Sequence, residues 1–225
     1  MIPRELLGTA QVPGGGEQLR LYRHDRDFVI ALDRNELMNS RMSGSEMALA
    51  TMTCDRLAGR NKPYLLIGGY GMGFTLRAAM AALGKDARIT VAELVPEIIV
   101  WARGPMVDLA AGCLEDPRVD LVLGDVGALI ASCTASYDAI LLDVDNGPDG
   151  LTCEDNAQLY TKHGLRAARA ALKPGGILAV WSATKDPAFT ARLNRAGFEV
   201  EEVGVRARSN GKGPMHVIWF AKAPA

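Results

Sequence analysis

Three acidic residues follow hydrophobic segments at points where a carboxylate could bind or deprotonate a ligand. Glu93 follows ITVA, Asp125 follows VDLVLG, and Asp143 follows YDAILL. Because parallel strands of a doubly wound sheet end at one crevice, we expect these carboxylates to lie near one another. Glu93 is placed to accept hydrogen bonds from ribose hydroxyls, and Asp125 from an adenine amino group. Each acid alone is equally typical of a helix N-cap or a solvated turn.

The glycine-rich stretch YLLIGGYGMGFTLRAA lies between a predicted strand and a predicted helix. Gly69, Gly71 and Gly73 allow a sharp turn and the close approach of a ligand, and we expect Tyr70 between them to line that ligand. Phe74 stands where a dinucleotide fingerprint has its third glycine, which disfavours an NAD(P) site. The remaining GxGxG resembles the cofactor turn of class I S-adenosylmethionine-dependent enzymes. A merely tight strand–helix turn is the alternative.

The stretch LLDVDNGPDG, residues 141 to 150, gathers three carboxylates after a hydrophobic strand. A calcium loop is disfavoured, because Gly147 and Pro148 stand where an acidic or amide ligand and a glycine are required. Asp149 suits a solvated turn. Asp143 follows the strand directly and is the candidate for chemistry, with Asp145 as a possible contact to an acceptor.

The elements that must position these residues alternate between strand and helix from about residue 62 onward. Apolar strands alternating with helices predict a parallel sheet covered on both faces. Two final segments around SNGKGP predict an antiparallel hairpin at one sheet edge. The fold class is therefore a doubly wound, Rossmann-like α/β sheet of the class I methyltransferase type. We expect a small N-terminal β-hairpin or meander over residues 1–42 and a cofactor-binding domain over 43–225.

Composition narrows the range of partners. The net charge of −1 gives no electrostatic reason to expect nucleic acid or an anionic membrane as a partner. No apolar run approaches the roughly 20 residues that cross a bilayer, and the first residues do not resemble a signal peptide. The four cysteines are isolated and have no histidine pair nearby, so we expect a reducing cytoplasm, no disulfide frame and no metal site.

At this point the residues resemble a family, the polyamine aminopropyltransferases (spermidine synthases) and their methyltransferase-like relatives. The resemblance rests on IALDRNELMNSRMSGSE, LLIGGYGMG, VAELVPEIIVWAR, DPRVDLVLGD, YDAILLDVDNGPDGL and ALKPGGILAV. It implies that Asp143 helps to take a proton from an attacking amine and that Glu93 and Asp125 contact adenosine. It also implies that Glu46 binds the acceptor amine, for which an ordinary acid on a helix surface is the alternative, and that the protein is a homodimer.

Three departures from the family pattern guide the prediction of the reaction. Met72 stands where the family has an acid that holds the amino end of decarboxylated S-adenosylmethionine. Gly44 and Ser45 replace two further family residues before Glu46, and Asp145 shifts or replaces a second carboxylate. His216 would reach the acceptor site only if the terminal hairpin folds over it, so we assign it no role.

We therefore predict methyl transfer from S-adenosylmethionine to a small amine, with Asp143 as the base or as an orienting carboxylate. The predicted cofactor contacts are Gly69, Tyr70, Gly71, Gly73, Glu93 and Asp125, and the predicted acceptor contacts are Asp145 and Glu46. One alternative is aminopropyl transfer from the decarboxylated cofactor to a polyamine. The other is a non-catalytic protein that binds an adenosine ligand.

Overall fold

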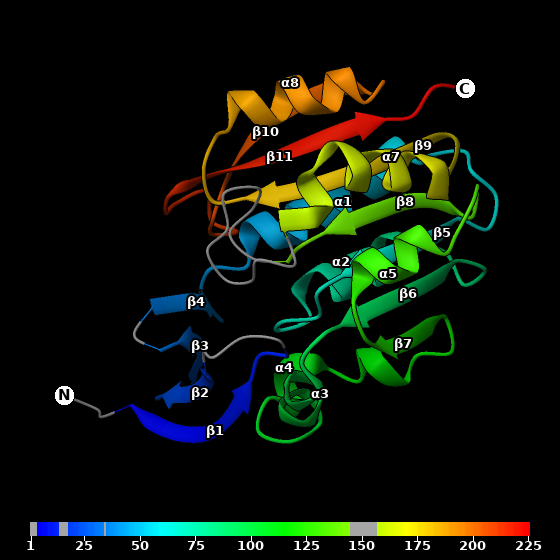
Figure 1. Cartoon of the computed structure of the whole chain (residues 1–225). Coiled ribbons are helices and arrows are strands. Elements are labelled where there is room, and N and C mark those ends of the chain that lie inside the picture. The colour runs from blue at the N-terminus through cyan, green and yellow to red at the C-terminus, as the bar shows by residue number, and fades with distance from the viewer. Residues whose placement is uncertain (1–3, 14–17, 34, 145–156) are drawn as a thin grey trace.

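Two β-sheets form the frame of the protein in the computed structural model (Figure 1), which describes residues 4–13, 18–33, 35–144 and 157–225. The first is a four-stranded antiparallel sheet with the order β1-β2-β3-β4. Its strands are β1 (Glu5–Gln11), β2 (Gln18–His24), β3 (Asp27–Leu32) and β4 (Asn35–Asn39). In β2, Leu19 and Leu21 are buried while Arg20 and Arg23 are more exposed, as the alternation of apolar and polar residues predicts.

The second sheet has seven strands in the order β10-β11-β9-β8-β5-β6-β7. Its strands are β5 (Tyr64–Gly68), β6 (Arg88–Glu93), β7 (Val119–Leu123), β8 (Tyr137–Leu142), β9 (Leu172–Ser182), β10 (Glu199–Arg206) and β11 (Met215–Lys222). Strands β5 to β9 pair in parallel, whereas β11 pairs antiparallel with both β9 and β10. The predicted fold class and the predicted C-terminal hairpin are confirmed.

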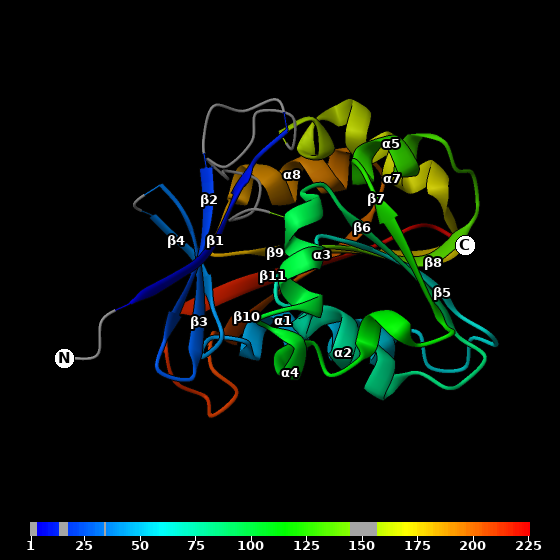
Figure 2. The ribbon, with the colours of Figure 1, turned by 90° about the horizontal axis from the view of Figure 1, so that it is seen from below.

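Helices cover both faces of the large sheet (Figure 2). The helices are α1 (Gly44–Arg56), α2 (Phe74–Ala82), α3 (Pro96–Arg103), α4 (Val107–Ala110), α5 (Val126–Ala131), α7 (Lys162–Ala171) and α8 (Pro187–Arg195), with short 3-10 turns η1 (Cys113–Glu115) and η2 (Gln158–Tyr160). Helices α1 and α2 lie on one face, and α5, α7 and α8 lie on the other.

Alternation along the central strands divides the core between these faces. Leu65 and Ile67 of β5 belong to the cluster that contains α1 and α2, whereas Leu66 belongs to the cluster that contains α5, α7 and α8. All three side chains are fully buried, as expected for a parallel strand covered on both sides. This rigid centre fixes the carboxyl ends of the strands, where the acidic residues lie.

The N-terminal element is a meander of four consecutive antiparallel strands, in which β1 and β4 flank the central hairpin of β2 and β3. Its separation from the rest of the chain at residues 42 and 43 stays a prediction. Asp145 lies outside the described residues. Of the helices in the described part of the chain, none has the length and apolar character needed to cross a membrane.

Candidate active site

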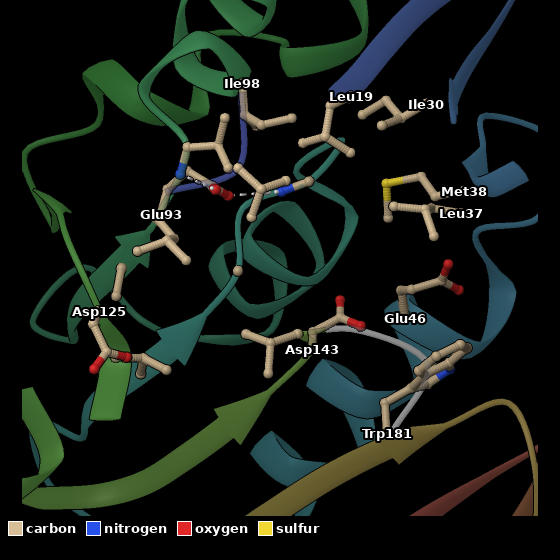
Figure 3. A pocket seen from close by; sticks show the side chains of 18 of the residues that line it. Leu19, Ile30, Leu37, Met38, Glu46, Glu93, Ile98, Asp125, Asp143 and Trp181 are labelled. Atoms are coloured by element: carbon tan, nitrogen blue, oxygen red, sulfur yellow. Dashed lines mark hydrogen bonds between the residues drawn. The ribbon is translucent and has the colours of Figure 1, made fainter. Parts of the chain in front are cut away.

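A cavity of about 180 Å³ lies at the carboxyl ends of the parallel strands, and the N-terminal sheet forms one of its walls (Figure 3). It is lined by Val12, Leu19, Ile30, Leu37, Met38, Glu46, Gly69, Gly71, Ala92, Glu93, Leu94, Val95, Ile98, Gly124, Asp125, Val126, Asp143, Val144 and Trp181. The two sheets therefore contribute different chemistry. The N-terminal sheet adds apolar side chains. The carboxylates come from the strand ends of the large sheet and, for Glu46, from helix α1.

The glycine turn between β5 and α2 leaves backbone open to this cavity. Gly69 and Gly71 have positive φ angles of 85° and 53°. A Cβ on Gly69 would lie 2.6 Å from the main-chain oxygen of Asp143, and one on Gly71 would lie 3.0 Å from the Met38 side chain. Glycine is required here by conformation and by space, so the turn suits a ligand that approaches the backbone closely.

Glu93 holds this turn in place. Its carboxylate accepts hydrogen bonds from the main-chain N–H groups of Tyr70 (2.9 Å), Gly71 (3.4 Å) and Val95 (2.9 Å). Burial raises the pKa of Glu93, and these three N–H groups oppose that rise by favouring the ionised form. The predicted contact with a ribose stays a prediction, and it would use the remaining acceptor capacity of the two oxygens.

The expectation that the Tyr70 side chain lines the ligand site is wrong. The ring is only 4% exposed and belongs to the hydrophobic core. Its hydroxyl lies 3.5 Å from Cys113 Sγ, and a Cβ on Gly73 would come within 2.7 Å of that hydroxyl. The turn directs this side chain away from the cavity, so only the main chain of Tyr70 serves the site. Gly73 likewise does not line the cavity but begins α2 next to the ring.

Asp125 reaches the edge of the cavity but also caps a helix. Its two oxygens accept hydrogen bonds from the N–H groups of Gly127 (2.8 Å) and Ala128 (3.2 Å) at the start of α5. Asp125 is therefore the N-cap of α5, the alternative role that the sequence left open for it. The contact with adenine stays a prediction, for which the exposed carboxylate is suitably placed.

Asp143 and Glu46 form a pair of carboxylates on the opposite side of the cavity from Asp125 (Figure 3). The Thr75 hydroxyl lies 2.6 Å from Asp143 Oδ2 and 3.3 Å from the main-chain oxygen of Glu46. Burial raises the pKa of Asp143 to about 6, against the effect of the Thr75 hydrogen bond. Burial and the negative charge of Asp143 raise the pKa of Glu46 to about 7. Carboxylates with such values can exchange protons near neutral pH.

Four contributors to the site, Thr75, Trp181, Ser45 and His216, had no assigned role in the sequence prediction. Thr75 follows the glycine turn, and Trp181 ends a hydrophobic strand, positions at which core packing is the ordinary expectation. Ser45 Oγ lies 2.7 Å from Glu46 Oε2 and 2.9 Å from Nδ1 of His216. The C-terminal hairpin therefore brings His216 next to Ser45 and so to the Glu46–Asp143 pair. From the sequence, a role for His216 depended on this placement, which the sequence alone did not show.

Met72 of the glycine turn does not face the cavity. Its side chain is 1% exposed and lies in the core. The described residues contain no group of three or more histidine, cysteine or acidic side chains suited to hold a metal ion. Among the described residues, the charged side chains that line the cavity are the carboxylates of Glu46, Glu93, Asp125 and Asp143, so this part of its lining is acidic.

Residues 45–194 match the family model of the spermine/spermidine synthase domain. The chain belongs to this family. The resemblance seen in the sequence is thereby confirmed, and the match contains the glycine turn, the strand-end carboxylates and both members of the Glu46–Asp143 pair.

Among curated members of the family, a polyamine aminopropyltransferase of Nitrosomonas europaea is 40% identical over 93 residues, which is 41% of this chain and 27% of that protein. A polyamine aminopropyltransferase of Korarchaeum cryptofilum is 31% identical over 118 residues, or 52% of this chain and 34% of that protein. Putrescine N-methyltransferase 4 of Nicotiana tabacum is 36% identical over 118 residues, covering 52% of this chain and 28% of that protein. The matches thus span about a third of these relatives' lengths.

Solved structures agree on the fold. A spermidine synthase in complex with the transition-state analogue AdoDATO superposes with a TM-score of 0.73 and 20% identity, covering 96% of this chain and 72% of that one. The spermidine synthase of Thermotoga maritima gives a TM-score of 0.72 with 18% identity, and the coverage is the same. The family fold therefore extends over nearly the whole chain.

Proposed function

We propose that this chain transfers an aminopropyl group from decarboxylated S-adenosylmethionine to the amine of a small acceptor. The observation that carries the proposal is a pair of carboxylates, the buried Glu46 and the partly buried Asp143, in a cavity beside an open glycine turn. The relatives named polyamine aminopropyltransferases support it. The sequence favoured methyl transfer, and the charge of the cavity shifts that preference.

Charge distinguishes the two cofactors. Decarboxylated S-adenosylmethionine carries a sulfonium and an ammonium group and has no carboxylate, whereas the ordinary cofactor has one. All the charged side chains among the described lining residues are acidic. A dication is stabilised in such surroundings, and an added carboxylate would be repelled unless main-chain N–H groups accepted it.

The residues present fit such a cofactor. The backbone at Gly69 and Gly71 would contact its tail, and Glu93 and Asp125 would lie along its nucleoside. When bound, the cofactor supplies an electrophilic carbon next to a positively charged sulfur. The chain's own task is to hold the acceptor amine in line with that carbon.

Asp143 and Glu46 give the amine its nucleophilic form. A protonated amine has no lone pair, so one proton must leave the acceptor before the carbon–nitrogen bond forms. Asp143 accepts that proton. The bound cofactor would supply the carbon that the amine attacks, and its sulfur would take the electron pair of the bond that breaks. The raised pKa values make these carboxylates better bases than ordinary surface acids.

Methyl transfer to a small amine is the second candidate. The departure at Met72 first suggested it, but that side chain lies in the core and does not line the cavity. The similarity to a putrescine N-methyltransferase supports the same reading. The acidic lining is the stronger observation, since it describes the cavity itself.

One experiment separates these functions. Purified protein is titrated with each cofactor and then incubated with a panel of monoamines, diamines and polyamines, and the products are weighed. We expect preference for the decarboxylated cofactor and a mass gain of one aminopropyl group. A gain of one methyl group from the ordinary cofactor would establish the second candidate. Binding without any product across the panel would favour the non-catalytic alternative.

The homodimer and the cytoplasmic location stay predictions. Sedimentation of the purified protein tests the first, and fractionation of cells that express it tests the second.

A further inference from the structure

We propose that Ser45 and His216 form a relay that carries the acceptor's proton away from Glu46. The proposal rests on the proposed function, because amine alkylation releases one proton in every turnover. Ser45 is fully buried, and its hydroxyl lies between Glu46 Oε2 at 2.7 Å and His216 Nδ1 at 2.9 Å. A hydroxyl has one proton to donate and can also accept, so it can link these two groups in either direction.

The start of α1 is shaped to receive the hairpin that carries His216. The Gly44 N–H donates to the main-chain oxygen of Ala207 over 2.8 Å. A Cβ on Gly44 would lie 2.4 Å from the carbonyl carbon of Arg208 and 2.5 Å from the N atom of Ser209. Only glycine leaves room for this backbone, so Gly44 and the hairpin loop form one docking contact.

That contact places His216 near the start of β11. The residue pairs in register with Val205 of β10, and its ring meets the edge of Trp181 with centroids 4.9 Å apart and planes at 84°. Trp181 also lines the cavity. The imidazole is therefore held by the hairpin and by an indole, and it is directed at Ser45.

Among the described residues, the His216 side chain contacts the uncharged Ser45 and Trp181. On helix α1, Ser45 links the imidazole to Glu46. Asp143, which follows β8, lies next to Glu46 in the cavity (Figure 3). Strand β9 brings the uncharged Trp181, and β10 brings Val205. The neighbouring Arg206 donates to the main-chain oxygen of Gly213 at 3.1 Å. Burial lowers the pKa of His216, so the ring is neutral near neutral pH and can accept a proton.

Asp143 takes the proton from the acceptor and passes it to Glu46, the neighbouring carboxylate with the higher pKa of about 7. Glu46 then donates to Ser45 Oγ while the Ser45 proton moves to His216 Nδ1. Glu46 is then a carboxylate again, Ser45 is a hydroxyl, and His216 is an imidazolium. The ring is only partly buried, so it can release the proton from Nε2 to solvent. The lowered pKa makes that release favourable.

Two substitutions and a control test the relay. His216→Gln keeps hydrogen-bonding groups at this position but cannot carry a proton. Ser45→Ala interrupts the hydrogen bonds between Glu46 and His216. His163→Gln is the control, because His163 is exposed on α7. We expect His216→Gln and Ser45→Ala to lower kcat about tenfold or more with little change in the KM of the acceptor. Added imidazole should restore much of the loss in a His216→Ala variant.

A role confined to holding Glu46 in place would give a different result. It predicts a raised acceptor KM and no rescue by imidazole, and that outcome would overturn the relay. A kcat of His216→Gln within twofold of the wild type would overturn it too. Thermal melting of each variant identifies any loss of folding, in which case imidazole rescue of His216→Ala at a temperature where it is folded decides.

A second readout does not depend on activity, and so separates failure of the relay from failure of the proposed function. The chain has three histidines, so nitrogen NMR with His24→Gln and His163→Gln spectra assigns His216. We expect the His216 pKa and its Nδ1 signal to change in Ser45→Ala and in Glu46→Gln. Signals that are unchanged in both variants would refute the link between the three residues, whatever the enzyme does.

Discussion

The Thr75 hydroxyl donates a hydrogen bond to Asp143 Oδ2 over 2.6 Å, joining the first turn of α2 to the residue that follows β8. This contact ties the glycine turn, which precedes Thr75, to the carboxylate proposed as the base. The cofactor site and the chemical group are therefore positioned by one another. A substitution that moves the glycine turn should therefore also change the position or the pKa of Asp143.

Replacing Thr75 with valine should raise the pKa of Asp143 further. Valine matches the shape of threonine but donates no hydrogen bond, and this bond lowers the pKa of Asp143. A group with a higher pKa becomes ionised only at higher pH, so the acidic limb of the rate profile should move upward by about one unit. Thr75→Ser keeps the donor and should keep the wild-type profile. Coinciding profiles for wild type and Thr75→Val would contradict the assignment of Asp143.

Replacing Asp143 with asparagine should remove the base and preserve the cavity. We expect cofactor affinity to change by less than about threefold and turnover to fall by about a hundredfold or more. Calorimetric titration measures the first quantity, and product formation under saturating acceptor measures the second. Asp120→Asn, an exposed change on β7, is the control. Undiminished turnover in Asp143→Asn would exclude this residue as the base.

Replacing Glu93 with glutamine should loosen the glycine turn. Three main-chain N–H groups donate to this carboxylate, and a glutamine amide would direct N–H groups toward at least one of them. We expect a loss of stability of about 2 kcal/mol, which is a fall in Tm of roughly 4–8 °C for a chain of this size, together with weaker cofactor binding. Glu97→Gln on α3 is the matched control. An unchanged Tm would mean that the turn does not depend on Glu93.

Much of the fold could be predicted because the central strands have simple patterns. Short apolar runs such as YLLIG and YDAILL end at glycine or aspartate, and the helices between them leave few alternatives to a parallel sheet. Helix α8 was not predicted, although Asp186 followed by Pro187 is an ordinary helix start, and Asp186 does accept from Phe189 N–H. Strands β1 and β4 are the edge strands of the N-terminal sheet, and each pairs with the strand next to it in the sequence.

The sequence predicted those residues of the site whose position is fixed by the end of a strand. Asp143, Glu93 and Asp125 follow strands, so topology alone brings them to the cavity. Tyr70 was misjudged because its backbone lies in the turn while its ring packs against Cys113, and side-chain direction there depends on three-dimensional packing. Ser45 and His216 lie 171 residues apart, and only the docking of the hairpin on Gly44 brings them together.

The Glu46–Asp143 pair should make the protein less stable as the pH rises. Burial and mutual repulsion raise the folded-state pKa of Glu46 from 4.5 to about 7. Between these values the folded protein binds more protons than the unfolded chain, so the free energy of unfolding falls with increasing pH. Glu46→Gln removes this ionisation and should stabilise the protein at pH 8 by up to about 3 kcal/mol, with little effect near pH 4.5. Urea unfolding of both proteins at the two pH values measures the difference, and exposed Glu201→Gln is the control. A Glu46→Gln effect that is the same at both pH values would show that Glu46 ionises normally, and the carboxylate pair would then lose its place in the proposed mechanism.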